Sequence, residues 1–202
     1  MTKEIRWRIL TLQAALVVLL AAGTGFAFWA NSFSTGMVKD QLTAQQIFFP
    51  GTDQIKAGGA LDPAEFPQEI RDQAGNQVVN GDQARIYAND FIAIHLTKVA
   101  NGLTYSQIGG AIAKLDKTSP TYTADVAKLN AAKQTLFMGE MLRTSLLNAY
   151  AWWTVGVFAG YAAWGLLIAT LAVFGAFAFE LLFAPRIEKR TVLTVKDARA
   201  VA

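Results

Sequence analysis

The chain has 202 residues, of which 53% are hydrophobic and 16% charged, and its formal net charge is +3 at pH 7. It contains no cysteine, which excludes disulfides, thiolate metal sites, iron–sulfur clusters and cysteine nucleophiles. The apolar excess lies in two runs, residues 9–30 and 150–184, and each is longer than the roughly 20 residues that a helix needs to cross a bilayer. We therefore expect a membrane protein with two transmembrane helices.

The charges at the ends of the chain predict its orientation. The N-tail, residues 1–8, and the C-tail, residues 185–202, are both basic, whereas residues 31–149 are close to neutral. Because Lys and Arg beside a span resist translocation, both termini should be cytoplasmic and residues 31–149 should lie outside the plasma membrane. Topology thus accounts for the positive charge, which gives no indication of nucleic-acid binding. The first run exceeds the apolar core of a cleaved signal, about 7–15 residues, which favours a retained anchor over a signal.

The first predicted helix continues past the membrane. Residues 31–49 contain few helix breakers, so we expect the first span to extend outward until Pro50 and Gly51 stop it. Residues 50–82 are rich in Gly and Pro and should be mostly ordered loop, with one short helix over residues 62–73. The anchor therefore leads directly into the outer domain.

Three further helices are predicted. Residues 83–101 repeat apolar side chains every three or four positions until Gly102, and residues 104–115 form a weaker helix that contains two adjacent glycines. The last helix starts at Thr121 or Thr123 and continues into the second apolar run. Apart from residues 77–79, no segment is typical of a strand. The expected fold is all-α, with two antiparallel transmembrane helices extended into a small extracytoplasmic helical domain.

Small residues on the second run predict close helix packing. Gly156 and Gly160 form a GxxxG pair, and Ala163 follows at helical spacing. Such residues let two backbones approach closely within a bilayer. In the first span, small residues lie at Gly23, Gly25 and Ala27. The partner of Gly156, Gly160 and Ala163 is therefore either this chain's own first span or another subunit, and the pattern does not choose between them.

Glu180 is the acidic residue inside the second run. A carboxylate within a membrane is a functional candidate because burying its charge is costly. However, Glu180 lies close to the expected cytoplasmic interface. We therefore expect it to reach water or to pair with a basic neighbour, with a proton relay or ion site as the alternative.

The polar residues of the outer domain predict a small interface or ligand cluster. His95 is the single histidine, and its spacing from Tyr87 and Phe91 places it on the apolar stripe, which favours a packed, hydrogen-bonded side chain over a catalyst. Glu140 and Arg143 are three apart on a helix and can pair. Together with Asn148 and His95 they could bind a partner loop or a lipid headgroup. Nothing in the pattern indicates a catalytic residue, metal site or cofactor.

Several blocks of residues resemble two-span membrane proteins of actinobacteria. These blocks are Gln45 to Pro50, Glu65 to Pro67, Ala84 to Ile92 with His95 and Leu96, Leu103 to Ser106, Thr135 to Phe137, and Gly139–Glu140 through Leu142–Arg143 to Tyr150. The resemblance covers residues 8–175 and implies two-span topology, but the family has no settled activity. Some distant relatives are labelled ring-opening dioxygenases, which this sequence contradicts because one histidine cannot build the usual iron site.

Two functions are compatible with these patterns. The first is a non-catalytic accessory or scaffold subunit of a larger plasma-membrane complex, such as respiratory or envelope machinery. The second is a membrane-anchored module that binds a lipid or another small molecule in the cell envelope. The expected partners are the lipid bilayer, other integral membrane proteins and a bound lipid. We favour the accessory role because it requires no chemical site.

Overall fold

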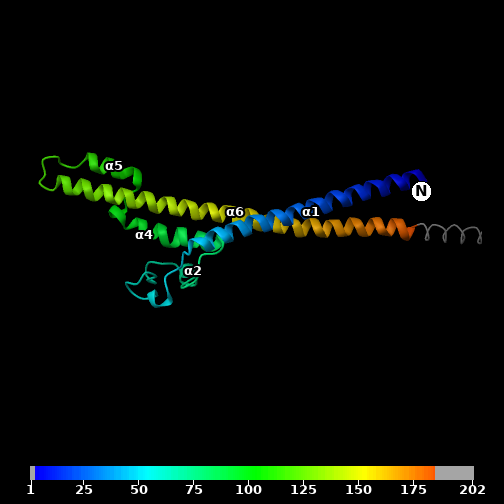
Figure 1. Ribbon diagram of the computed structural model, residues 1–202, viewed down its shortest axis with the longest axis horizontal. Coiled ribbons are helices and arrows are strands. Elements are labelled where there is room, and N and C mark those ends of the chain that lie inside the picture. Colours follow the sequence, from blue (N-terminus) through cyan, green and yellow to red (C-terminus); the bar gives the residue numbers. More distant parts are fainter. Residues whose placement is uncertain (1–2, 185–202) are drawn as a thin grey trace, which may run out of the picture. The chain divides into compact units, whose positions relative to one another are not determined.

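The computed structural model describes residues 3–184, so the basic C-tail lies outside the described residues. The chain comprises two compact units: unit 1, residues 1–32 and 157–202, and unit 2, residues 33–156. The described residues contain no strand, which confirms the all-α prediction (Figure 1). The elements are α1 (Lys3–Gln45), η1 (Thr52–Gln54), α2 (Gln68–Arg71), α3 (Gly81–Ile86), η2 (Tyr87–Ile92), α4 (Ala93–Thr97), η3 (Val99–Gly102), α5 (Tyr105–Ala113) and α6 (Tyr122–Leu182).

Helix α1 ends four residues earlier than expected, at Gln45. Gln46 adopts a left-handed conformation with φ 52°, which ends the helix before the proline is reached. The next residues form a short extended pairing, in which Val78 N–H donates to Ile47 O at 2.8 Å and Phe49 N–H donates to Asn76 O at 2.9 Å. This pairing needs extended backbone on both sides. The prediction of a helix through residue 49 was therefore wrong, because the local sequence does not show that residues 47 and 49 pair with residues 76 and 78.

Helix α2 is also shorter than the predicted 62–73. The carboxylate of Asp62 accepts hydrogen bonds from the N–H groups of Gly58 at 2.7 Å and Ala64 at 2.9 Å, which closes a local turn. These two bonds stabilise the charged form and lower the pKa of Asp62. Such side-chain bonds compete with helix formation. Regular helix starts only after Pro67, at Gln68.

Residues 81–97 form one helical stretch that includes a π-helical segment. Asn80 caps it by accepting a hydrogen bond from Gln83 N–H at 2.9 Å, so it begins two residues before the predicted position. A β-carbon at Gly81 would overlap the side chain of Trp153 on α6, and glycine is therefore required there. The π-helical segment η2 adds residues to its turn and shifts the buried register of the residues that follow.

Helices α5 and α6 agree with the sequence prediction. Thr104 and Gln107 form a capping box at the start of α5, and the paired glycines do not break the helix. Helix α6 continues for 61 residues from Tyr122 without interruption, which corresponds to about 90 Å at 1.5 Å per residue. The second apolar run is therefore part of a much longer helix, as predicted from the continuation of the last helix into it.

The core of unit 2 combines residues from α1, α6 and the segments between them. Its buried members are Val38, Leu42, Phe49, Leu61, Phe66, Ile70, Val78, Ala84, Ile86, Ala88, Ile92 and Leu146. The contributing segments lie far apart in the chain, so residues 33–156 are held together by packing between distant segments as well as by their helices. It anchors the elements that carry the candidate site.

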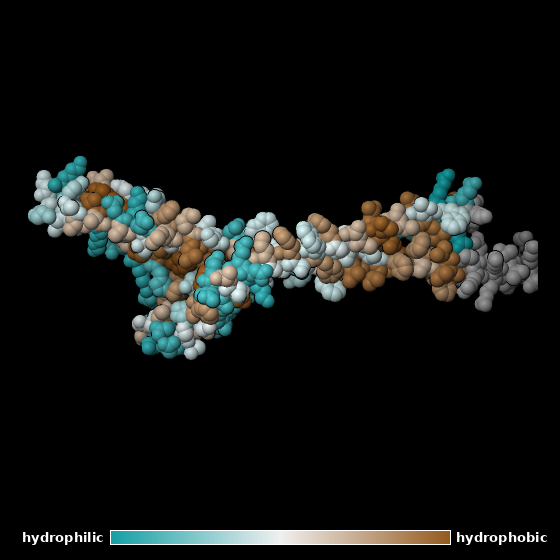
Figure 2. All heavy atoms as spheres, viewed as in Figure 1, coloured by the Kyte–Doolittle hydropathy of each residue, from teal (hydrophilic) through white to brown (hydrophobic). Residues whose placement is uncertain are grey.

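Unit 1 consists of the apolar parts of α1 and α6. Thr24 and Thr170 approach at 3.4 Å between hydroxyl oxygens, and the Phe28 and Trp164 rings meet edge to face at 5.6 Å. Both helices are long and apolar enough to cross a membrane, judged by length and composition. Only 11% of the most apolar window of α1 and none of that of α6 is buried. Apolar side chains thus cover the surface of both helices here (Figure 2).

Candidate functional site

The small residues Gly156, Gly160 and Ala163 face helix α1 of the same chain. In unit 2, a β-carbon at Gly156 would lie 2.8 Å from Thr35 Cγ2 and 3.0 Å from Ser34 Cβ. In unit 1, a β-carbon at Gly160 would lie 2.9 Å from Asn31 Nδ2, and Ala163 is fully buried. Of the two partners that the sequence left open, the structure places the chain's own first helix against these residues.

The contacting residues on α1 differ from those expected. A β-carbon at Gly25 would have no neighbour within 4 Å, and one at Gly23 would meet only Leu166 at 3.7 Å. Gly156 and Gly160 instead pack against polar side chains at residues 31, 34 and 35. The backbone of α6 is also held here, because Ser34 Oγ donates a hydrogen bond to Trp152 O at 2.6 Å.

Glu180 is paired with a basic residue, as expected from its position. Its carboxylate lies 3.5 Å from Arg6 Nε, and Arg6 Nη2 also donates to the backbone oxygen of Glu180 at 2.6 Å. The partner comes from the N-terminal end of α1, which spacing along α6 could not reveal. This pairing supports the structural interpretation of Glu180.

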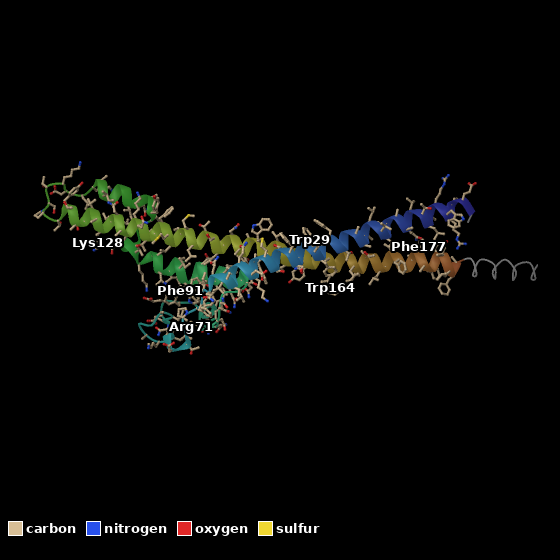
Figure 3. The ribbon with its side chains drawn as sticks, in the orientation of Figure 1. Trp29, Arg71, Phe91, Lys128, Trp164 and Phe177 are labelled. Atoms are coloured by element: carbon tan, nitrogen blue, oxygen red, sulfur yellow. The ribbon has the colours of Figure 1, made fainter. Side chains whose placement is uncertain are left out.

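His95 is exposed, which corrects the prediction that it is packed on the buried stripe. The buried positions of this helical stretch are Gly81, Ala84, Ile86, Ala88 and Ile92, and the wide turn of η2 moves His95 away from the core. The ring still packs beside Phe91 at 4.4 Å and Phe66 at 5.4 Å between centroids. Figure 3 marks Phe91 next to the α2 region that carries Arg71.

We expect His95→Ala to lower the free energy of unfolding by about 0.5–1.5 kcal/mol, the usual contribution of an aromatic pair. His95 Nδ1 also lies 2.8 Å from Phe91 O, within the same helical stretch. His95→Phe, which keeps a ring against Phe66 and Phe91, should retain most of the stability. Thermal unfolding in detergent measures both variants. A loss above about 3 kcal/mol would instead place His95 in the core.

A cavity of about 470 Å³ lies beside α6 in unit 2, within the range of roughly 300–1,000 Å³ that is usual for small-molecule sites. Its apolar walls come from Ala93 and Leu96 of α4, Leu103, and the buried Leu136 of α6. Leu96 approaches α6 closely because a glycine, Gly139, stands opposite: a β-carbon there would lie 3.0 Å from Leu96 Cδ1.

The polar end of this cavity is formed by Glu140 and Arg143. Arg143 Nη1 lies 3.4 Å from Glu140 Oε2, which confirms the predicted pair, and Arg143 Nη2 donates to Asn89 Oδ1 at 3.1 Å. The Nε atom of Arg143 is buried and has no hydrogen-bond acceptor. Buried donors are nearly always paired, so this atom marks a place where an acceptor is missing.

The segment before α5 forms the rim of the cavity. Ala100, Asn101 and Gly102 all adopt left-handed conformations, with φ of 50°, 54° and 81°. This conformation is strained for alanine and persists only where surrounding contacts enforce it. It directs the chain so that Thr104 and Ser106 line the cavity with hydroxyl groups.

Charged groups on the neighbouring helices perturb one another. Glu69 and Arg85 form an ion pair, which raises the pKa of Arg85 through the hydrogen bond to Glu69. Burial raises the pKa of Asp90, and the charge of Glu69 adds to this effect. Within the part of the chain that the structure describes, no group of three His, Cys, Asp or Glu side chains could hold a metal ion.

The four expected cluster residues do not meet in one place. Glu140 and Arg143 line the cavity, whereas Asn148 lines a second cavity of about 180 Å³ between α1 and α6, and His95 contacts Phe66. Sequence reasoning missed Asn89 as the partner of Arg143. It also missed the cavity, whose lining combines residues 93–106 with residues 136–143 of α6.

No family model, curated protein or solved structure matches the chain. The functional interpretation therefore rests on the geometry of the two units.

Proposed function

We propose that the chain is a non-catalytic accessory or scaffold subunit of a larger plasma-membrane complex. In this proposal α1 and α6 cross the bilayer as antiparallel helices, both termini are cytoplasmic, and residues 31–149 lie outside. The observation that carries the docking role is an uncovered apolar strip on α6, described below.

The surface of unit 1 supports membrane insertion. Large apolar side chains such as Leu12, Leu19, Phe26 and Ile168 are about 70% exposed. A soluble protein buries such helices in its core, and an apolar surface of this extent in water would drive aggregation. The contacts of Arg6 with Glu180 and of Thr24 with Thr170 support the antiparallel arrangement, because residue numbers rise along α1 as they fall along α6.

The proposed topology predicts which positions an impermeant thiol reagent can reach in intact cells. The natural chain has no cysteine, so Lys117→Cys, at an exposed position between α5 and α6, and Glu4→Cys, near the N-terminus, each supply one unique thiol. We expect labelling of Lys117→Cys in intact cells and labelling of Glu4→Cys only after permeabilisation. The reverse pattern would contradict the orientation.

An apolar strip on α6 supports the docking role. Residues spaced by three or four positions lie on one face of a helix. One such face consists of Met138, Met141, Leu142, Ser145, Ala149, Trp152 and Gly156. Helix α1 covers its second half, where Ser34 and Thr35 contact Trp152 and Gly156.

The first half of this strip has no cover from α1, which ends at Gln45 beside Ser145. Met138, Met141 and Leu142 are therefore 57%, 52% and 42% exposed. We name these three residues the docking strip. Its occupant in this proposal is an apolar helix of another integral membrane protein, which continues the α1–α6 interface past the end of α1. Methionine suits such a surface because its flexible side chain adapts to a partner.

We expect the double variant Met138→Lys, Met141→Lys to reduce recovery of the partner from native membranes by about fivefold or more, because each ammonium group must be desolvated in the interface. The measurement is quantitative mass spectrometry of proteins that co-purify with the tagged chain in mild detergent. The matched control, Met138→Leu, Met141→Leu, keeps the strip apolar and should retain the partner.

Two results would contradict the accessory role. One is equal recovery of every co-purifying protein with the Lys and Leu variants. The other is recovery of a second copy of this chain as the sole stoichiometric companion, which would make the docking strip a homodimer interface.

A second function, a membrane-anchored module that binds a lipid or small molecule, is favoured by one specific observation. The cavity beside Arg143 joins apolar walls to a charged end in the same unit. The two functions are compatible, since the docking strip and the cavity residues occupy different positions on α6.

A further inference from the structure

We propose that the cavity beside Arg143 binds a single-chain zwitterionic amphiphile, a molecule with one apolar chain, a phosphate group and an ammonium group. This site goes beyond the docking role. It takes from the proposed function only that α6 enters the bilayer near Tyr150.

The phosphate position is assigned by Arg143, which lines the cavity. Two of its nitrogens already have partners, Glu140 at 3.4 Å and Asn89 at 3.1 Å, so the guanidinium is held in place. The Arg143 side chain is still 32% exposed, so a phosphate oxygen in the cavity can reach the guanidinium. A guanidinium matches an oxyanion in geometry and charge.

The ammonium position is assigned by Glu140. Its carboxylate lines the same cavity, and its side chain is half exposed, so a ligand can reach it. A purely anionic head would be repelled by this carboxylate, and a purely cationic one would be repelled by Arg143. A head that carries both charges complements the pair, with the phosphate at Arg143 and the ammonium at Glu140.

The apolar chain is assigned by the rest of the cavity. Leu96, Leu103 and Leu136 provide apolar walls next to the charged end. A volume of about 470 Å³ is small within the usual range of roughly 300–1,000 Å³ for ligand sites, which favours one chain over two. Along α6, Arg143 precedes Tyr150 by about two helical turns, or roughly 10 Å. A lipid from the outer leaflet is therefore a nearby source.

The test measures, by titration calorimetry, how tightly three probes bind to the purified full-length protein in a neutral detergent. Lysophosphatidylethanolamine carries both head charges, lysophosphatidic acid lacks the ammonium group, and monoacylglycerol lacks both charges. We expect the first probe to bind at least about fivefold more tightly than the other two, since each charge gains a hydrogen-bonded partner.

Variants assign each half of the head. Arg143→Gln should weaken binding of lysophosphatidylethanolamine by about tenfold or more, and Arg143→Lys, which keeps the charge but lacks Nε, should weaken it less. Glu140→Gln should abolish the preference over lysophosphatidic acid. The matched control is Lys128→Gln, which removes a charge from an exposed site on the same helix and should have no effect (Figure 3).

Three outcomes would overturn the site: no binding of lysophosphatidylethanolamine to the wild-type protein, equally tight binding of monoacylglycerol, or unchanged binding in both Arg143 variants. Thermal unfolding of each variant shows whether it is folded. If Arg143→Gln does not fold, binding to Arg143→Lys decides the test. This test is independent of the docking role, because the Met138 and Met141 variants should lose the partner and still bind the amphiphile as the wild-type protein does.

Discussion

Leu146→Ala should lower the free energy of unfolding by about 2–5 kcal/mol, the usual cost of removing a buried leucine side chain and leaving a cavity. Leu146 is 1% exposed and is the fully buried residue that α6 contributes to the core of unit 2. It packs in the same cluster as Val38 and Leu42 of α1, so its truncation weakens the contact of both long helices with the domain.

Leu142→Ala is the matched control for this variant. Leu142 lies one turn earlier on the same helix and is 42% exposed, so the same truncation should change stability by less than about 1 kcal/mol. Thermal unfolding in detergent compares the two, with about 2–4 °C expected per kcal/mol for a chain of this size. Equal shifts in melting temperature for both variants would show that the core is not organised around Leu146.

Gly160→Leu should destabilise the helix pair of unit 1 by about 1–3 kcal/mol, because a larger side chain has no space at this position. Even the first added carbon would lie 2.9 Å from Asn31 Nδ2 and 3.2 Å from Asn31 Cγ. The two backbones must therefore move apart or the Asn31 side chain must leave its site. The measurement is the melting temperature in detergent, with crosslinking between α1 and α6 as a second readout.

Gly165→Leu provides the control, since it changes the same residue type on the same helix. A β-carbon at Gly165 would have no neighbour within 4 Å, so the leucine side chain can point outward without a clash. Stability should be unchanged or slightly higher, because leucine favours helix more than glycine does. A larger loss at Gly165 than at Gly160 would mean that the contact face of α6 has been assigned wrongly.

The helices themselves could be predicted from local patterns. The two apolar runs and the absence of Gly or Pro pairs between Thr121 and Tyr150 were enough to place α6, whose bounds are Tyr122–Leu182. The predicted helix over residues 104–115 likewise corresponds to α5, Tyr105–Ala113. These predictions succeeded because helix formation depends on residues within a few turns of one another. The Glu140–Arg143 pair also lies within one turn.

The errors occurred where distant segments meet. Helix α1 ends before Ile47 because the next residues pair with Asn76 and Val78, and His95 is exposed because a π-helical turn shifts its register. The partner of Arg143 is Asn89, 54 positions away in the chain. Periodicity alone assumes regular helix and carries no information about such contacts.

The sequence by itself therefore determined that the chain is helical and that two of its helices are long and apolar enough to cross a membrane. Only the tertiary structure decided that Gly160 packs on Asn31 of the same chain and that Arg143 and Leu136 share a cavity with Leu103. The physical reason is range. Hydropathy and helix capping act between near neighbours in the chain, whereas close packing and cavities depend on which distant surfaces come into contact.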